Sequence, residues 1–261
     1  MQSLSGIKHP AFQDALALLK PAGRTAAGRF LAEDRHLVDQ ALSDGTVVVH
    51  AVFSLIEEAD HLAPTCSARE VPLFIATRGL MAKLLGTVYE TSTTAVAIVS
   101  KAPASMERLL APNAVVLCGE RIQDPRNVGV MVRTADALGC TGVLLSSDSA
   151  DPWQRAAVRS TTGSILRTPV LLVDDLAGTL AGCATAGATV VGSSGAAQRS
   201  ASTMPPARPL VVVLGNEQAG ISKAVAAACT AVVRIPMAPA TRADSLNVTV
   251  AAGILLHEAF R

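Results

Sequence analysis

The chain has 261 residues, of which 50% are apolar and 16% are charged, with a formal net charge of +1. This composition excludes a disordered or low-complexity chain, and we expect a folded protein of one large or two modest domains. No apolar run reaches the roughly 18 residues of a membrane span, and the N-terminus lacks a signal-peptide core, so we expect a cytoplasmic protein.

The charge balance and the cysteines give little sign of a partner or a metal. A net charge of +1 does not indicate a nucleic-acid partner, so any RNA-binding surface has to be a local patch. The five cysteines form no Cys-x-x-Cys pair, and the five histidines are scattered along the chain. We therefore expect neither a disulfide framework nor a metal site.

The first 103 residues alternate between helical and extended patterns. Helices are predicted at His9–Lys20, Asp34–Leu42, Leu55–Asp60 and Arg78–Leu85, and strands at Arg29–Glu33, Thr46–Phe53, Val71–Ala76 and Ala95–Val99. Asp34 and Thr77 are the predicted caps of two of these helices. Such alternation predicts a small three-layer α/β/α domain over residues 1–103.

The stretch Lys101–Asn113 contains two Ala-Pro pairs, and residues 104–112 within it are interpreted as a linker to a second domain over residues 113–261. Strands are predicted there at Ala114–Cys118, Gly142–Ser146, Pro169–Val173, Ala188–Gly192, Leu210–Leu214 and Ala231–Ile235. Helices are predicted at Asn127–Leu138, Pro152–Ser160, Asp174–Ala186, Ile221–Cys229 and Leu246–Phe260. Continuous apolar strands with interleaved helices predict a mostly parallel sheet that is covered on both faces.

The last two predicted strands each end in a loop of small and polar residues. Leu210–Leu214 opens into Gly215–Gly220, and Ala231–Ile235 opens into a loop that ends at Ser245. This pattern is typical of buried parallel strands that deliver their carboxyl ends to a ligand crevice, although two ordinary strand-to-helix turns would look the same.

The amino-acid sequences of these loops resemble motifs of a known protein family. LGNEQAGIS at 214–222, IPM at 235–237 and SLNVTVAAGILLHEA at 245–259 resemble the second and third motifs of the SpoU/TrmH family of RNA ribose 2′-O-methyltransferases, in the SPOUT superfamily. Asn127-Val128-Gly129 followed by Arg133-Thr134-Ala135 resembles the first motif. The N-terminal layout and the phrase FLAEDRHLVDQAL resemble the RNA substrate-binding domain of such enzymes, a fold shared with ribosomal proteins.

The resemblance implies a fold and a reaction that the apolar pattern does not reveal. SPOUT domains carry a C-terminal trefoil knot that holds S-adenosylmethionine, and they usually form homodimers. The implied reaction transfers the sulfonium methyl group to a ribose 2′-hydroxyl of RNA. Because the sulfonium is already activated, the protein has to align the reacting atoms and help remove the hydroxyl proton.

The motifs place candidate catalytic residues at Asn127, Arg133, Glu217, Ser245 and Asn247. Arg133 matches the essential arginine of the family. A guanidinium keeps its proton, so orienting an RNA phosphate is an easier role for Arg133 than that of the base. Glu217 either contacts Arg133 or the substrate, or anchors its own loop. Ser245 and Asn247 either contact the substrate or cap the last helix.

The resemblance also implies which residues bind the cofactor. These are Leu214, Gly215, Asn216, Ile235, Met237, Ser245 and Leu246. Gly215 and Gly220 would let the backbone approach the cofactor closely.

Candidate RNA-binding residues are arginines and one lysine, each of which could equally be a solvated surface charge. Arg126 shares a helix face with Arg133, and Arg29, Arg35 and Arg159 are the other main candidates. Further candidates are Arg24, Arg69, Arg78, Lys83 and Arg167.

We therefore interpret the chain as a homodimeric methyltransferase that acts on ribosomal RNA. A transfer-RNA methyltransferase and a non-catalytic RNA-binding protein with the same fold are the alternatives. A nucleotide-binding oxidoreductase would need a Gly-x-Gly-x-x-Gly fingerprint after a strand, which the sequence lacks.

Overall fold

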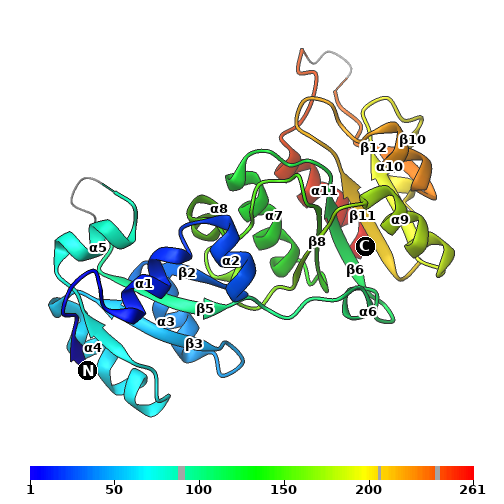
Figure 1. Cartoon of the computed structure of the whole chain (residues 1–261). Helices are drawn as coiled ribbons and strands as arrows, with labels where there is room; N and C mark the ends of the chain where they lie inside the picture. Colours follow the sequence, from blue (N-terminus) through cyan, green and yellow to red (C-terminus); the bar gives the residue numbers. More distant parts are fainter. Residues whose placement is uncertain (88–91, 205–206, 239–241) are drawn as a thin grey trace. The chain divides into compact units, whose positions relative to one another are not determined.

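The computed structural model describes residues 1–87, 92–204, 207–238 and 242–261, and the chain divides into two compact units (Figure 1). Unit 1 comprises Met1–Ala102 and Trp153–Arg167, and unit 2 comprises Pro103–Pro152 and Thr168–Arg261. The division differs from the predicted domains in two segments: Trp153–Arg167 was expected in the second domain, and residues 104–112, expected as a linker, belong to unit 2. Part of the predicted loop after Ile235, residues 239–241, lies outside the described residues.

Unit 1 contains a mixed sheet whose five strands, among the described residues, have the order β1-β4-β3-β5-β2. Its elements are β1 (Gln2–Ser3), α1 (Pro10–Ala17), α2 (Pro21–Ala27), β2 (Arg29–Glu33), α3 (Arg35–Ser43), β3 (Val49–Ser54), α4 (Ile56–Ala68), β4 (Leu73–Ile75), α5 (Arg78–Leu84), β5 (Ala95–Ser100), α8 (Arg155–Ser160) and the 3₁₀ turn η1 (Ser164–Leu166). Strand β5 runs antiparallel to both of its neighbours, β2 and β3.

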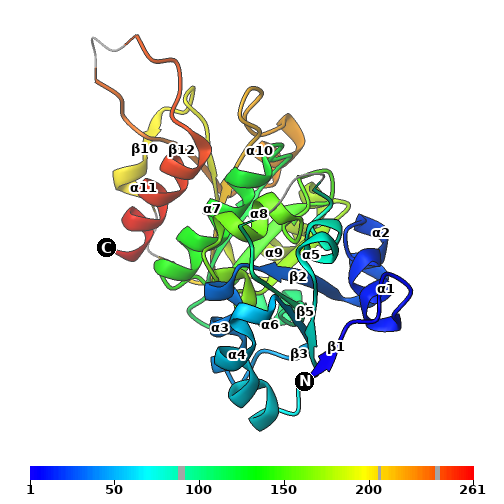
Figure 2. The ribbon, with the colours of Figure 1, turned by 90° about the vertical axis from the view of Figure 1, so that its left-hand side faces the viewer.

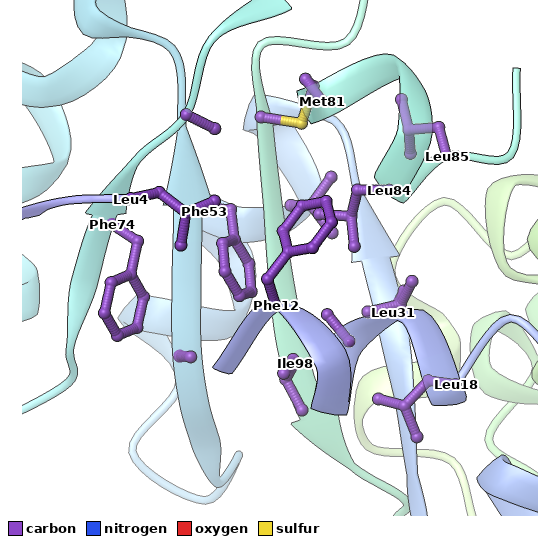
Figure 3. Close-up of a cluster of buried hydrophobic side chains, with 14 of the residues drawn as sticks. Leu4, Phe12, Leu18, Leu31, Phe53, Phe74, Met81, Leu84, Leu85 and Ile98 are labelled. Carbon is purple, nitrogen blue, oxygen red and sulfur yellow. The ribbon is translucent and has the colours of Figure 1, made fainter. Parts of the chain in front are cut away.

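One face of this sheet is covered by α1 and α5, whose side chains form a cluster with the strands (Figure 3). Phe12 from α1 and Phe53 from β3 lie edge to face, and Phe53 stacks on Phe74 from β4. Met81 and Leu84 close the cluster from α5. Burial of these side chains removes apolar surface from water and holds the two helices on the sheet.

Helices α3 and α4 also pack on the strands of unit 1, through residues that the sequence pattern identified. Leu37, Val38, Ala41 and Leu42 of α3 are buried, as the 3.6-residue spacing predicts. Asp34 caps α3 by accepting a hydrogen bond from the His36 N–H. Helix α4 continues to Ala68 instead of ending near Asp60, because Leu62 and Cys66 are buried on its inner side.

The segment Trp153–Arg167 is held to the rest of unit 1 by a buried charge. Arg155 on α8 pairs with Glu33 at the end of β2, and it also donates to the Leu85 carbonyl. The Nζ atom of Lys101 lies 3.7 Å from the centroid of the Trp153 ring. The amphipathic pattern that predicted α8 contains no information on which sheet the helix would join.

Unit 2 is built on a parallel sheet, as predicted. Within the described residues its strand order is β10-β12-β9-β11-β6-β7-β8. Its elements are α6 (Met106–Leu109), β6 (Val115–Gly119), α7 (Pro125–Ala137), β7 (Gly142–Ser146), β8 (Val170–Val173), α9 (Leu176–Thr185), β9 (Thr189–Ser193), β10 (Arg199–Ser200), η2 (Ala201–Thr203), β11 (Leu210–Leu214), α10 (Lys223–Ala228), β12 (Ala231–Arg234) and α11 (Val248–Phe260).

Helices cover both faces of this sheet, which is why its central strands are apolar at nearly every position. All residues of β6, β7 and β11 are buried. Helices α9 and α10 pack together on one face, over Val116 and Val211. Helices α7 and α11 pack against each other and against the strands, and they can be followed side by side in Figure 2. Over the described ranges, no helix is long and apolar enough to cross a lipid bilayer.

Candidate active site

A cavity of about 320 Å³ opens in unit 2 where three adjacent strands end. Its walls come from the carboxyl ends of β9, β11 and β12 and from the segment that leads into α11. The lining residues are Ser193, Ser194, Gly195, Leu214, Gly215, Asn216, Glu217, Gln218, Ala219, Gly220, Ile235, Met237, Asp244, Ser245, Leu246, Val248 and Ala251. Ligand crevices of open parallel sheets form at such carboxyl ends.

The loop after β11 closes on itself through the backbone. Asn216 and Gly220 exchange two backbone hydrogen bonds of 3.1 and 2.9 Å. The Asn216 Oδ1 atom accepts from the N–H groups of Gln218 and Ala219 at 3.0 Å. A Cβ atom at residue 215 would lie 2.0 Å from the Gly220 carbonyl carbon, so this closure requires glycine. The close approach at Gly215 is thus to its own loop, and an approach to a cofactor stays a prediction.

Glu217 ties this loop to the start of α7. Its Oε1 atom accepts from Asn127 Nδ2 at 2.9 Å and from the Asp124 N–H at 3.4 Å, and its Oε2 atom accepts from the Gln123 N–H at 3.3 Å. Asn247 Nδ2 donates to Asn127 Oδ1 at 3.4 Å. The structure therefore joins one predicted catalytic residue from each of the three motifs in a single chain of hydrogen bonds.

These contacts shift the pKa of the Glu217 carboxyl. Partial burial raises this pKa, but the hydrogen bonds from Asn127 and from backbone N–H groups outweigh burial and leave the pKa below its ordinary value of 4.5. Glu217 is consequently ionised at neutral pH and is a weak proton acceptor.

Arg133 lies on the exposed side of α7, outside this hydrogen-bonded chain. Among the described residues its guanidinium makes no hydrogen bond and no ion pair. Arg126, which is seven residues earlier on the same helix, is exposed and pairs with Asp124 at 3.2 Å. Val128, Met131, Val132 and Ala135 occupy the buried side. The fold thus leaves Arg133 available to an anionic ligand.

The two predicted residues of the third motif take different positions. Ser245 is exposed and lines the cavity. Asn247 caps α11 through its Oδ1 atom, which accepts from the Thr249 N–H at 2.8 Å and from Thr249 Oγ1 at 2.6 Å. Its Nδ2 group remains directed to Asn127. The Asn247 side chain therefore both caps α11 and contacts Asn127 of the first motif.

All of the predicted cofactor-binding residues line the cavity, namely Leu214, Gly215, Asn216, Ile235, Met237, Ser245 and Leu246. Sequence reasoning missed the wall formed by Ser193, Ser194 and Gly195 after β9, and it missed Asp244. The signal for the missed wall was a Ser-Ser-Gly run directly after the predicted strand Ala188–Gly192, the same pattern that identified the other two loops.

The arginine candidates of unit 1 differ in how far the fold already uses them. Arg29 is half-buried on β2, and Arg159 is exposed on α8. Arg35 lies 3.6 Å from Asp39 and 3.4 Å from Glu58, and Arg78 pairs with Glu57 at 2.5 Å. Arg24 is 5% exposed and donates to the carbonyls of Leu18 and Leu19, so the expectation of an exposed phosphate ligand is wrong for this residue.

The chemistry of the cavity is that of a small organic ligand. Its size is at the lower end of the range of small-molecule sites, and apolar side chains alternate with backbone groups in its wall. Three or more His, Cys, Asp or Glu side chains that could hold a metal ion together do not occur in the described part of the chain. The ionised Glu217 lines the cavity, and the exposed Arg133 lies on α7, whose Asn127 is hydrogen-bonded to Glu217.

Comparison with known proteins identifies the family. Residues 114–257 match the profile of the SpoU rRNA Methylase family. An uncharacterized tRNA/rRNA methyltransferase of Synechocystis is 31% identical over 99% of this chain and 93% of its own length. A Mycobacterium tuberculosis tRNA/rRNA methyltransferase is 37% identical over 58% of this chain, which spans about half (46%) of that relative.

Solved structures agree with this match over both units. The AdoMet-bound rRNA methyltransferase from Sinorhizobium meliloti has a TM-score of 0.83 at 27% identity, with 98% of this chain and 96% of that chain covered. The SpoU methyltransferase AviRb from Streptomyces viridochromogenes, in complex with AdoMet, has a TM-score of 0.82 at 28% identity, with 97% of each chain covered. The chain belongs to the SpoU/TrmH family of RNA methyltransferases.

Proposed function

We propose that this protein transfers a methyl group from S-adenosylmethionine to a ribose 2′-hydroxyl of ribosomal RNA. The observation that carries the proposal is the cavity of unit 2, which is lined by every residue that the family motifs predicted for the cofactor. Two structural neighbours, described as an rRNA methyltransferase and a SpoU methyltransferase, bind AdoMet.

The lining of the cavity suits the chemistry of this cofactor. Leu214, Ile235 and Leu246 offer apolar surface for an adenine ring, and the loop from Gly215 to Gly220 offers backbone groups for hydrogen bonds. The sulfonium of the bound cofactor supplies an activated methyl group. The protein's part is to fix the direction from which the hydroxyl oxygen meets that group.

Arg133 is placed so that its side chain can bind an RNA phosphate. It is exposed and without a partner among the described residues, and it lies on the helix whose Asn127 is bonded to Glu217. A guanidinium beside the phosphate next to the target ribose orients the nucleotide and stabilises the developing alkoxide. We assign Arg133 this role rather than that of a base, because a guanidinium group is a hydrogen-bond donor with no free acceptor.

Glu217 is assigned to the loop rather than to proton transfer. Its pKa is held below 4.5 by the hydrogen bonds that it accepts, so it is a poor match for the very weakly acidic ribose hydroxyl. Asn127 and Asn247 complete the support of the loop. Ser245 lines the cavity two residues before Asn247. We propose that Ser245 contacts the substrate or the cofactor directly.

Three further features of the proposal follow from family membership. Residues 1–103 would bind the RNA substrate, residues 104–112 would link them to the methyltransferase domain at 113–261, and the loops after β11 and β12 would form a trefoil knot. Exposed apolar side chains on α11, Val250 at 50% and Phe260 at 44%, support a homodimer. Arg29, Arg35, Arg126 and Arg159 are the proposed RNA contacts beyond the reacting nucleotide.

The test is a methyl-transfer assay that identifies the product. Purified protein is incubated with methyl-labelled S-adenosylmethionine in two parallel reactions. One contains ribosomal RNA and the other contains transfer RNA, both from a strain that lacks the gene. The RNA is then digested and the nucleosides are resolved by mass spectrometry. A labelled 2′-O-methylnucleoside from ribosomal RNA alone is expected. Label in transfer RNA would replace the proposed substrate, and label on a base would overturn the ribose assignment.

A further inference from the structure

The cavity of unit 2 carries a negative charge. Of the described residues that line it, only Glu217 and Asp244 are charged. Lysine and arginine side chains are absent from that lining. A carboxylate near an RNA-binding surface repels phosphate, so an acidic cavity in such a protein calls for a positive ligand.

The two carboxylates differ in how far they are already used. Glu217 accepts hydrogen bonds from Asn127 and from two backbone N–H groups. Asp244 is exposed, and among the described residues it makes no hydrogen bond and no ion pair. Asp244 is therefore the carboxylate of the cavity that is free to act on a ligand.

The charge of the proposed ligand changes during the reaction. S-adenosylmethionine carries a sulfonium, an ammonium and a carboxylate, and its net charge is about +1. Transfer of the methyl group leaves S-adenosylhomocysteine, in which the sulfur is a neutral thioether and the net charge is about zero. A fixed carboxylate within a few ångströms therefore attracts the donor more strongly than the product, whichever group it contacts.

We propose that Asp244 is a specificity-determining residue that makes the cavity prefer the positively charged methyl donor over its neutral product. The inference rests on the proposed function, since it assumes that the cavity binds this cofactor. The inference goes beyond that function because it assigns the weaker binding of the product to a residue outside the recognised motifs. Since Asp244 is exposed, solvent weakens its field, and the expected preference is about fivefold.

The experiment is calorimetric titration of the full-length protein with S-adenosylmethionine, S-adenosylhomocysteine and sinefungin, an analogue with an amine in place of the sulfonium. The measured quantity is the ratio of the product's Kd to the Kd of each positively charged ligand. The variants are Asp244→Asn, which removes the charge, and Asp244→Glu, which retains it. Asp174→Asn is the matched control, because Asp174 is exposed in unit 2 and does not line the cavity.

For Asp244→Asn we expect both ratios to fall by about fivefold, while Asp244→Glu and Asp174→Asn keep the wild-type ratios. Higher salt should reduce the ratios of the wild type towards those of Asp244→Asn. Equal loss of affinity for all three ligands, or unchanged ratios, would overturn the role of Asp244. If the wild-type protein bound none of them, the proposed function itself would fail.

Discussion

Arginines in the two units are used in different ways. In unit 1, Arg69 donates to the carbonyls of Ala41, Leu42, Asp44 and Val47 over 2.7–3.0 Å. In unit 2, Arg133 is exposed and has no partner among the described residues. Both were candidates for phosphate binding, and only the second is available. The difference arises because carbonyl groups at the end of α3 and in the turn after it have no partner in a helix or strand. These carbonyl groups surround the guanidinium of Arg69, whereas no such groups surround that of Arg133 among the described residues.

The largest effect that this comparison predicts is on Arg133→Ala. Loss of a preorganised cation at the reacting nucleotide should lower methyl transfer by about 100-fold or more. The melting temperature should hardly change, because the side chain is exposed and has no partner in the described part of the chain. Single-turnover methyl transfer, with thermal unfolding in parallel, measures both. Arg108→Ala, at an exposed position on α6 of the same unit, is the matched control and should retain most of the activity.

The opposite pattern is expected for Arg69→Ala. Removal of the guanidinium leaves four carbonyl groups of unit 1 without their donor, which should cost about 2 kcal/mol in the free energy of unfolding. Denaturant unfolding measures the loss. Arg78→Ala removes only an exposed ion pair and should change stability little. Equal effects of Arg69→Ala and Arg78→Ala would contradict the structural role of Arg69.

The carboxyl groups of Glu33 in unit 1 and Glu217 in unit 2 should make opposite contributions to the pH dependence of stability. Burial raises the pKa of Glu33 above 4.5, against the lowering effect of Arg155, so ionisation of Glu33 costs stability and that cost appears as the pH rises through the raised pKa. The pKa of Glu217 is below 4.5 in spite of burial, so its stabilisation is present above 4.5 and is lost as the pH falls through the lowered pKa.

Hydrogen exchange resolved by unit, between about pH 3 and 7, separates these two effects. Glu33→Gln should flatten the pH dependence of unit 1 relative to the wild type, and Glu217→Gln should flatten that of unit 2 and weaken the loop after β11 by about 1 kcal/mol. If the stability of each unit depended on pH in the same way in both variants and in the wild type, the environments assigned to Glu33 and Glu217 would be contradicted.

The strands of unit 2 could be predicted because their physical signal is local. Runs such as Gly142–Ser146 and Leu210–Leu214 are apolar at nearly every position, and the structure assigns both with the predicted bounds. The predicted cap and inner face of α3 are likewise confirmed. In each case the residue's own neighbours in sequence decide the structure.

Other features depend on partners far away in the sequence. Helix α8 joins unit 1 through Arg155 and Glu33, which are 122 residues apart. Arg24 and Arg69 looked like surface charges until the fold supplied carbonyls for them. The wall of the cavity at Ser194 comes from β9, a strand outside the three motifs. Single-sequence patterns do not contain such contacts.

The central claim is that the cavity of unit 2 binds the methyl donor, and blocking the cavity tests it most directly. Gly195 lines the cavity, and a Cβ atom there meets nothing within 4 Å, so Gly195→Trp adds bulk at the cavity wall without a clash of its Cβ atom. Gly182→Trp, at a similarly open and exposed position on α9, is the matched control. In calorimetric titrations with S-adenosylmethionine, we expect the control to bind like the wild type and Gly195→Trp to lose at least about 100-fold in affinity, or roughly 2.7 kcal/mol. Wild-type affinity in a folded Gly195→Trp protein would contradict the account.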